Sequence, residues 1–433
     1  MLKLDHKQKD FRQQLEKFCA SSSQEPEIVR TVSEILAVVR ERGNSGVLYY
    51  TAKFDHTKLT SRQMRVSAGA LEQAVAALPA AARKAIDDAI KSIREFHKRT
   101  LPKPWEARNS HGGRVGEVFH PIRRCGLYIP GGQVPLVSTV LMTAIPAQLA
   151  GVPQLVACTP PQPNGQIAPT ILAALHLCGV SEVHAVGGVQ AIAAMTYGTE
   201  TILPVNKIFG PGNAYVCEAK RQVFGTVGVD LLPGPSELMV IADATATPEW
   251  VAADLLAQAE HGTGKEKIYL ITTHTPLIHK VEQAMEVQLA SLSHAKKIRE
   301  VLAKGYCVIH APKLEQAAEI ANFVAPEHLE LQVTEKEVPR LARQITTAGA
   351  MLFGSHTPTV LGDFTAGPSH TLPTGCTGRF FSGLQVSDFM RRTSILEYGP
   401  ENLKKAASVV NAFSGMERLD AHGRSLAIRL GEK

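Results

Sequence analysis

The chain has 433 residues, of which 44% are hydrophobic and 20% charged, so it can form two or three domains with large buried cores. The net charge of +6 is spread along the chain without a dense Lys/Arg block, which argues against nucleic acid as the main partner. The N-terminus lacks the apolar core of a signal peptide, and no run of about 18 apolar residues is free of Pro or charge. The seven cysteines form no CxxC pair, which argues against a cysteine-based zinc site. We therefore expect a cytoplasmic protein that makes no membrane contact.

The first hundred residues are predicted to be helical. Residues Glu27–Arg42 place apolar side chains at helical spacing on one face, and the pattern ends at Gly43. A second helical stretch, Leu71–Leu101, is expected to break near Leu78-Pro79. No chemistry is indicated in this region, so we expect a scaffold and a dimer contact.

From about Gly113 onward, short apolar runs alternate with helical periods. This alternation is typical of parallel sheets covered by helices, and there are enough units for two sheets, which we expect to separate near Pro233-Gly234-Pro235. The expected strands are Gln154–Thr159, Glu182–Val186, Glu237–Ala242, Lys267–Thr272 and Cys307–His310. The expected helices between them include Pro169–Cys178, Pro248–Glu260 and Lys313–Phe323.

The C-terminal part changes character again. Gly367–Gly383 is rich in Gly, Pro, Thr and Ser and is expected to be a loop. Glu401–Leu430 is predicted to be helical, but it carries polar residues that a plain packing helix would not need. It is either a tail that reaches onto another subunit or a simple covering helix.

Three glycine turns are candidates for a nucleotide site. The chain contains no complete GxGxxG and no Walker A motif, because Gly262–Lys265 lacks the required spacing. The three turns, Tyr128–Gly132, Val186–Gln190 and Phe209–Asn213, each follow an apolar run and precede a helical segment. Each turn alone is typical of an ordinary turn between a strand and a helix. Because three of them occur close together, a shared dinucleotide-binding cleft is the alternative interpretation.

Candidate metal ligands occur in separate fragments. Gln258 and His261 are three residues apart, so they share a helix face and are compatible with zinc, although an exposed helix end would look the same. Two further pairs are either metal ligands or ordinary polar residues of the surface. One lies in the loop after residue 362 and the other in the C-terminal helical stretch. These pairs are Asp363 with His370, and Glu417 with His422.

Glu327 and His328 are the candidate acid–base residues. They are adjacent and lie between a predicted helix and the apolar run Leu329–Val333. On a loop both side chains could face a cleft, where His can accept a proton near neutral pH and Glu can activate water. The alternative is a helix end with two solvated polar residues.

Taken together, these fragments resemble the histidinol dehydrogenase family in their order and spacing, from about Val29 to the C-terminus. No single fragment is specific, but the joint match is. The matching segments are Gly126–Gly132 (GLYIPGG), Val186–Ala194 (VGGVQAIAA), Ile208–Val216 (IFGPGNAYV), Gly234–Glu237 (GPSE), Leu255–Gly262 (LLAQAEHG), Ala325–Glu330 (APEHLE), Gly362–Thr374 (GDFTAGPSHTLPT) and Glu417–Ser425 (ERLDAHGRS).

The resemblance implies L-histidinol as substrate, NAD as cofactor and one zinc ion (Zn2+) per subunit. It implies four zinc ligands that also contact the substrate, namely Gln258, His261, Asp363 and His422. It implies further substrate contacts at Ser236, Glu327, His328, His370 and Glu417, and NAD contacts at Tyr128, Gln190 and Asn213. In this family the C-terminal tails cross over in a homodimer, so Glu417 and His422 would complete the neighbouring subunit's site.

The resemblance also implies an α/β fold of two Rossmann-like parallel-sheet domains that lack a standard GxGxxG, with a helical N-terminal region and a small helical C-terminal tail. We expect residues 1–120 with 236–372 to form the first domain, including the helical N-terminal region, and 121–235 to form the NAD-binding domain. Residues 373–433 would form the tail that crosses the dimer.

The implied mechanism is two successive oxidations, with His328 as the base in both and Glu327 activating water in between. One alternative is a related zinc dehydrogenase of another polar alcohol or a sulfonated diol, which would not need the carboxylate of Glu417. Another is a non-catalytic zinc-binding scaffold, against which the intact Glu327 and His328 argue.

Overall fold

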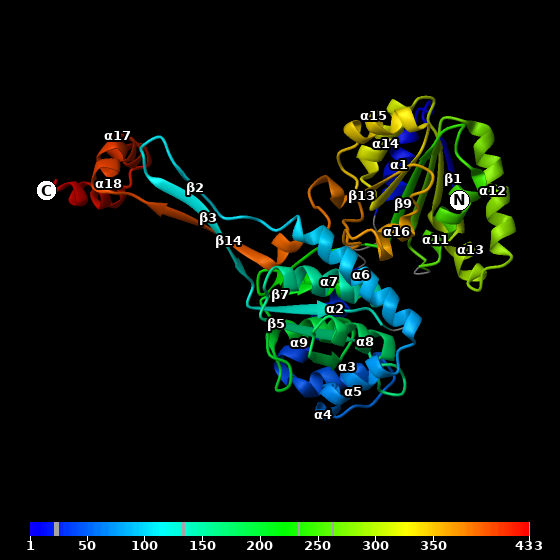
Figure 1. The fold of residues 1–433 in the computed structure, drawn as a ribbon, viewed down its shortest axis with the longest axis horizontal. Helices are drawn as coiled ribbons and strands as arrows, with labels where there is room; N and C mark the ends of the chain where they lie inside the picture. Colours follow the sequence, from blue (N-terminus) through cyan, green and yellow to red (C-terminus); the bar gives the residue numbers. More distant parts are fainter. Residues whose placement is uncertain (21–25, 132–134, 233, 262–263, 433) are drawn as a thin grey trace.

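The fold consists of two α/β lobes and a projecting arm (Figure 1). The computed structural model describes residues 1–20, 26–131, 135–232, 234–261 and 264–432. Pro233, near which the two sheets were expected to separate, lies outside these residues, as do Gly132 and Gly262 of the motifs above. The predicted α/β class with two parallel sheets is confirmed. Within the described ranges, no helix is both long enough and apolar enough to cross a lipid bilayer.

The first lobe is built on a six-stranded parallel sheet with the order β1-β11-β10-β9-β12-β13. Met239 and Ile241 of β9 pack into the core on one face, whereas Leu238 and Val240 pack into the core on the other. Because helices cover both faces, β9, β10 and β11 are largely apolar, which is why apolar runs predicted them, whereas β12 also carries buried polar side chains. The strands are β1 (Leu2–Asp5), β9 (Glu237–Ala242), β10 (Lys267–Thr272), β11 (Tyr306–His310), β12 (His328–Gln332) and β13 (Ala350–Phe353). The helices are α1 (Phe11–Cys19), α14 (Leu314–Val324) and α15 (Val338–Gln344) on one face, and α11 (Pro248–Ala259), α12 (Thr275–Leu289) and α13 (Ala295–Gly305) on the other.

The second lobe contains a five-stranded parallel sheet with the order β6-β5-β4-β7-β8. Its strands are β4 (Arg124–Tyr128), β5 (Gln154–Thr159), β6 (Glu182–Ala185), β7 (Lys207–Phe209) and β8 (Gly228–Val229). One face packs against α5 (Ala68–Ala76), α6 (Ala80–Lys98), α7 (Val137–Leu149) and α8 (Pro169–Leu177). The other packs against α2 (Pro26–Arg42), α3 (Asn44–Phe54), α9 (Gly188–Tyr197) and α10 (Ala214–Val223). The short helix α4 (Ser61–Met64) lies between α3 and α5 in the chain.

The N-terminal helices pack on the second sheet, and not on the first as the expected grouping of 1–120 with 236–372 placed them. Val32 of α2 shares a core with Ile192 of α9, and Ile93 of α6 shares a core with Ile145 of α7. From the N-terminal part, β1 and α1 join the first sheet. Helical periodicity identifies the apolar face of each helix but not the element that covers it, so the sequence could not assign the partner. The expected break near Leu78-Pro79 separates α5 from α6.

The arm is a three-stranded antiparallel sheet that ends in two helices (Figure 1). Its strands, in spatial order, are β14 (Met390–Glu397), β3 (Arg114–Pro121) and β2 (Trp105–Arg108), and its helices are α17 (Pro400–Glu417) and α18 (Asp420–Ala427). The helices match the predicted stretch Glu401–Leu430, but the strands were not predicted. Most of their side chains are partly or fully exposed, so they carry no apolar run that would indicate strands. The remaining elements are α16 (Thr359–Phe364) and short 3-10 turns at Glu335–Glu337, Thr377–Arg379, Val386–Phe389 and Ile428–Leu430.

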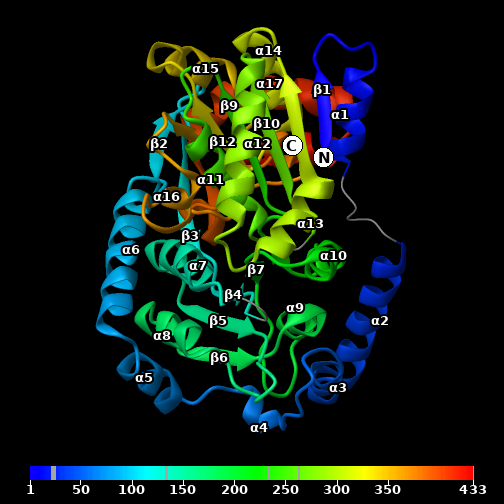
Figure 2. The same ribbon diagram turned by 90° about the vertical axis from the view of Figure 1, so that its right-hand side faces the viewer.

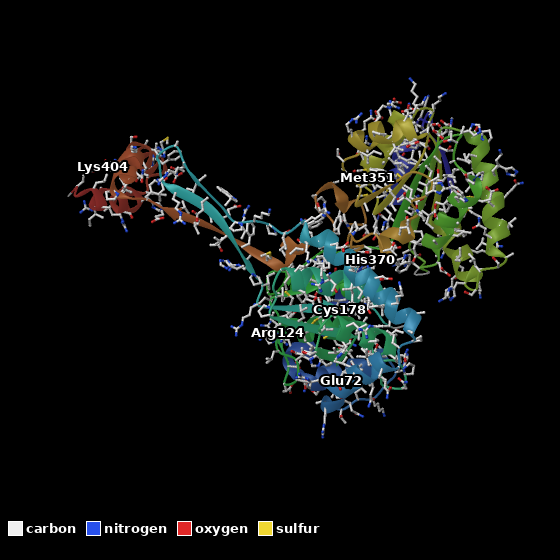
Figure 3. All side chains as sticks on the ribbon, in the orientation of Figure 1. Glu72, Arg124, Cys178, Met351, His370 and Lys404 are labelled. Carbon is white, nitrogen blue, oxygen red and sulfur yellow. The ribbon has the colours of Figure 1, made fainter. Side chains whose placement is uncertain are left out.

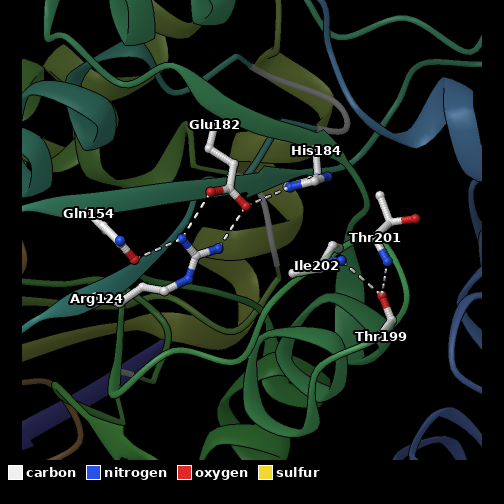
Figure 4. A network of polar contacts seen from close by, with 7 residues as sticks. All are labelled: Arg124, Gln154, Glu182, His184, Thr199, Thr201 and Ile202. Carbon is white, nitrogen blue, oxygen red and sulfur yellow. Dashed lines mark hydrogen bonds and ion pairs between the residues drawn. The ribbon is translucent and has the colours of Figure 1, made fainter.

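A polar network ties together three neighbouring strands of the second sheet at their amino ends (Figure 4). The guanidinium of Arg124 on β4 donates hydrogen bonds of 2.9 and 2.7 Å to the carboxylate of Glu182 on β6. It also donates to Gln154 on β5 at 3.4 Å. His184 Nε2 lies 3.2 Å from the same carboxylate. Burial alone would raise the pKa of Glu182, but the hydrogen bonds and charges of His184 and Arg124 outweigh it and lower the pKa to about 2.

Glu182→Gln is expected to lower the free energy of unfolding at neutral pH by on the order of 1–3 kcal/mol, because Arg124 loses its charged partner. Since an ordinary glutamate has a pKa of 4.5, the stabilisation is present above that pH and is lost as the pH falls towards 2. Urea unfolding of both proteins over this range should show the difference shrinking. Asp88→Asn, which breaks an exposed pair with Lys84, should change little. A difference that does not depend on pH would contradict the assignment to Glu182.

Candidate active site

Glu327 and His328 lie where the chain passes from α14 into β12. Ala325 adopts a left-handed conformation (φ 50°) that ends the helix, and β12 begins at His328. The side chains of Glu327 and His328 are buried, with 7% and 5% of each residue exposed, so they are not the solvated helix end of the alternative interpretation. Glu327 Oε2 accepts a hydrogen bond of 2.9 Å from the backbone N–H of Glu237, and its Oε1 lies 3.9 Å from His328 Nε2.

Burial is the largest influence on the protonation of this pair. It raises the pKa of Glu327 well above the ordinary value, against the hydrogen bond from the Glu237 backbone and with help from the charges of Glu237 and Asp363. Burial also lowers the pKa of His328 to about 3, with smaller contributions from His370 and His261. At neutral pH His328 is therefore an uncharged imidazole, the form that can accept a proton.

Gln258 and His261 lie at the carboxyl end of α11. Gln258 is only 3% exposed, and its side-chain nitrogen has no hydrogen-bond partner. His261 follows the helix end and is exposed, but the protein around it disfavours its charged form and lowers its pKa, against the charges of Glu266 and Glu260. The alternative of an exposed helix end thus fits His261 but not Gln258. A buried amide without a partner is costly, so it points to a ligand that binds there.

Asp363 and His370 come from α16 and the loop that follows it. His370 Nδ1 lies 3.3 Å from the backbone carbonyl oxygen of Asp363. Burial raises the pKa of Asp363 to about 6 and lowers the pKa of His370 to about 4. The charge of Asp363 contributes to the raised pKa of Glu327. The charge of His261 contributes to the lowered pKa of both His370 and His328. Side chains from α11, β12, α16 and its following loop are therefore brought into one cluster.

This cluster lies at the amino edge of the first sheet, because β12 and β9 begin at His328 and Glu237. In Figure 2 the arrow of β11 points away from the second lobe, so the amino ends of this parallel sheet face that lobe. The loop that carries His370 also touches the second lobe. A Cβ added to Gly367 would come within 2.8 Å of the backbone oxygen of Ser92 on α6. The cluster is therefore at the junction of the lobes.

Glu417 and His422 do not join this cluster within one chain. They lie on α17 and α18 of the arm, and both are exposed. Figure 3 shows the separation: Lys404 of α17 is at the far end of the arm, whereas His370 is at the junction of the lobes.

One chain gathers only part of the expected zinc site. An amide oxygen from Gln258, an imidazole nitrogen from His261 and a carboxylate oxygen from Asp363 are suitable ligands for zinc. Across the described ranges, no three His, Cys, Asp or Glu side chains are grouped so that they could hold a metal ion. Two of the four expected ligands do not enter this count: Gln258 is a glutamine, and His422 lies far away on the arm. The residues present therefore fit a zinc ion if one more ligand is supplied.

The three expected NAD contacts follow strands of the second sheet at their carboxyl ends. Tyr128 ends β4, and its hydroxyl accepts a 3.2 Å hydrogen bond from the backbone N–H of Gly188. Gln190 is 1% exposed, and its Nε2 donates to Asp55 Oδ2 at 3.3 Å, whereas its Oε1 has no partner. Asn213 caps α10 by accepting hydrogen bonds of 3.1 Å from two backbone N–H groups of the first turn. Polar groups thus line the turns after β4, β6 and β7, where a dinucleotide binds in sheets of this kind.

Sequence reasoning missed two carboxyl groups at these sites, the buried Glu237 and the partly buried Asp55. Glu237 follows the half-buried Ser236, and its Oε1 accepts a 3.2 Å hydrogen bond from the backbone N–H of Gly375. Burial, with a smaller contribution from Cys376, raises the pKa of Glu237 to about 8. A charged residue at the start of an apolar strand was a signal that could have identified it. Asp55, whose pKa burial raises to about 6, lies in a helical region that carried no such signal.

Comparison with known proteins identifies the family. The family model described as histidinol dehydrogenase matches residues 19–430. The chain belongs to the histidinol dehydrogenase family. Within this family, histidinol dehydrogenase of Agrobacterium fabrum is 44% identical over 428 residues, which cover 99% of this chain and 98% of the relative. That of Syntrophotalea carbinolica is 43% identical over 422 residues, 97% of each chain.

A solved member of the family has the same fold. The crystal structure of histidinol dehydrogenase from Elizabethkingia anophelis aligns with a TM-score of 0.92 at 34% identity, over 100% of this chain and 98% of the other. The family expected from the sequence motifs is therefore confirmed, and the protein is an NAD-dependent oxidoreductase of that family.

Proposed function

We propose that the protein oxidises L-histidinol to L-histidine through L-histidinaldehyde, with two molecules of NAD as hydride acceptors, which is the last step of histidine biosynthesis. The observation that carries this proposal is the buried Glu327–His328 pair beside Gln258, His261 and Asp363 at the junction of the lobes. The family match over residues 19–430 supports the same reaction.

We propose that zinc is held by Gln258, His261 and Asp363 of one subunit and by the partner subunit's His422. The burial of Gln258 and the raised pKa of Asp363, which desolvation causes, support this. A zinc ion bound there would orient the substrate through its imidazole and amino nitrogens. Ser236 and His370 would be further substrate contacts, and the partner subunit's Glu417 would offer a negative charge to the substrate ammonium.

In the proposed mechanism His328 and Glu327 move the protons. His328 accepts the proton of the substrate hydroxyl as the hydride on the same carbon passes to NAD, and it then releases that proton to solvent. Glu327 takes a proton from water as the water oxygen attacks the aldehyde carbon, and it returns that proton to the former carbonyl oxygen, which gives the hydrated aldehyde. Its raised pKa, which burial causes, makes the Glu327 carboxylate a stronger base towards water than an exposed glutamate. His328 accepts a second proton as the hydrated aldehyde gives its hydride to a second NAD, so each oxidation removes one proton and one hydride.

The NAD molecules would be held by Tyr128, Gln190 and Asn213. Gln190 Oε1 is buried without a partner, so it is available as a hydrogen-bond acceptor for the cofactor. Asn213 stands at the amino end of α10, where backbone N–H groups favour a negatively charged phosphate.

We propose that the arm pairs with a second copy of the chain. Large apolar side chains on it are exposed, and an exposed apolar patch in a folded protein marks an interaction surface. They include Leu396 (72% exposed), Phe413 (54%), Met416 (69%) and Ile428 (60%). A homodimer with crossed arms would cover these residues and would bring Glu417 and His422 to the partner's cluster. We place this dimer in the cytoplasm, since all seven cysteines are free.

The proposed function predicts that each histidinol yields two NADH, and that a strong chelator abolishes the yield until zinc is restored. The measurement is NADH formed against a limiting amount of histidinol, with and without chelator. One NADH per substrate would contradict the proposed second oxidation. Activity with a sulfonated diol and none with histidinol would replace the proposed substrate, and zinc-loaded protein that binds histidinol without forming NADH would be a binding scaffold.

A further inference from the structure

A polar cluster, buried except for the partly exposed Asp254, lies on the same three elements as the candidate active site. It consists of Glu330 and Gln332 on β12, Thr359 at the start of α16 and Asp254 on α11. Glu330 is 1% exposed, Gln332 2% and Thr359 5%. The reaction proposed above assigns no role to any of them. Buried polar groups in such a place are costly unless they are hydrogen-bonded, so their contacts are informative.

Glu330 is the centre of the cluster. Its Oε1 accepts hydrogen bonds from both the backbone N–H and the hydroxyl of Thr359, at 2.9 and 2.7 Å. Its Oε2 accepts from Gln332 Nε2 at 2.9 Å, and the same amide group donates to Asp254 Oδ2 at 2.8 Å. Burial, followed by the charge of Glu330, raises the pKa of Asp254 to about 8. The raised pKa favours the protonated form of Asp254, whose proton can be shared with Glu330.

Each contact of the cluster reaches an element that carries an active-site residue. Glu330 is two residues beyond His328 on β12. Thr359 begins the short helix α16, which ends just after Asp363. Asp254 lies four residues before Gln258, one turn earlier on α11. The Glu330 carboxylate thus connects β12, which carries His328, directly with α16. Through Gln332 it also connects β12 with α11.

We propose that Glu330, with Gln332 and Asp254, is a positioning group that sets α11 and α16 at the separation the zinc ligands require and holds both in register with His328. The inference rests on the proposed function. It adds a positioning role for residues that take no part in the proposed reaction steps. Partners that orient metal ligands from behind commonly affect metal affinity or activity by about 10–100-fold.

Glu330→Leu tests the proposal, because it keeps the volume and removes both acceptor oxygens. We expect the affinity for zinc, measured by competition with a chromophoric chelator, to fall about 10–100-fold. The absorption spectrum of the Co²⁺-loaded protein should change, and KM for histidinol should rise more than kcat falls. The affinity for NAD, which binds the other lobe, should stay the same. Glu330→Gln, which retains one acceptor oxygen for Thr359, should recover most of the zinc affinity.

Asp254 provides an independent variant. Asp254→Asn supplies an amide N–H in place of the carboxylic proton, so it should weaken zinc binding less than Asp254→Leu does. Equal losses in the two variants would overturn the shared-proton arrangement. Glu218→Leu is the matched control: Glu218 is 3% exposed and paired with Arg221 on α10 in the other lobe, so its loss should lower stability but not zinc affinity.

The outcomes separate this inference from the function it rests on. Wild-type protein that neither binds zinc nor forms NADH would overturn the proposed function. Wild-type zinc affinity and an unchanged Co²⁺ spectrum in folded Glu330→Leu would overturn the positioning role alone. If Glu330→Leu does not fold, Thr359→Val decides, because it removes the hydroxyl that donates to Glu330, and wild-type zinc affinity in that variant would also overturn the positioning role.

Discussion

His328→Ala is expected to lower kcat about 10²–10⁴-fold while the affinity for histidinol changes little. The reason is that His328 is buried and uncharged, so its contribution is to take the proton that each oxidation releases. Removing the base affects the barrier more than the bound state, which places the loss in kcat rather than in binding. Steady-state NADH formation gives kcat, and calorimetric titration of the zinc-loaded variant with histidinol gives the affinity.

Two further variants make this test specific. His176→Ala, at an exposed position on α8, is the control and should behave as wild type. Glu327→Gln should separate the two oxidations, because it leaves His328 in place but removes the base for water. In a single turnover it should therefore form the first NADH much faster than the second. A His328→Ala protein that turns over at the wild-type rate would refute the assigned base.

Two inactive variants are expected to restore each other's activity when their subunits are mixed. His328→Ala removes the base, and His422→Ala removes a proposed zinc ligand that reaches the partner subunit. In a mixed dimer with crossed arms, one of the two sites contains both substitutions and the other contains neither. Random exchange of subunits at equal amounts should therefore restore about a quarter of the wild-type activity.

The same experiment contains its own control. Mixing His328→Ala with Asp363→Ala should restore no activity, because both residues serve the site of their own chain and every site then lacks one of them. Subunit exchange can be started by mild denaturant and followed by recovery of NADH formation. If the His328→Ala and His422→Ala mixture stays inactive after exchange, His422 does not act across the dimer.

Several interior strands of both lobes were predictable from the sequence, because they are continuous apolar runs covered by helices on both faces. Gln154–Thr159, Glu237–Ala242 and Lys267–Thr272 were predicted with the bounds that the structure shows. The strands of the arm were not predicted, since strands that face solvent carry no such run. The partner of the N-terminal helices was not predictable either, because it depends on contacts far apart in the chain.

The residues of the candidate site were identified through resemblance, since composition and spacing left each fragment ambiguous. Gln258 and Asp363 are separated by more than a hundred positions, and no local pattern shows that they meet. The supporting carboxyl groups were missed for a different reason. Glu330 lies within a motif that matched the family, but its function depends on Thr359 and Asp254, which the structure alone brings to it.

The residues proposed to bind the substrate and those proposed to bind NAD come from different lobes, and this division has a consequence for the proposed reaction. A reactive aldehyde must not escape between the two oxidations. Anchored on the first lobe, it can wait while the spent nucleotide leaves the second and a fresh one replaces it. With this architecture the aldehyde can stay bound while NADH is exchanged for a second NAD, and no additional segment is needed to enclose it.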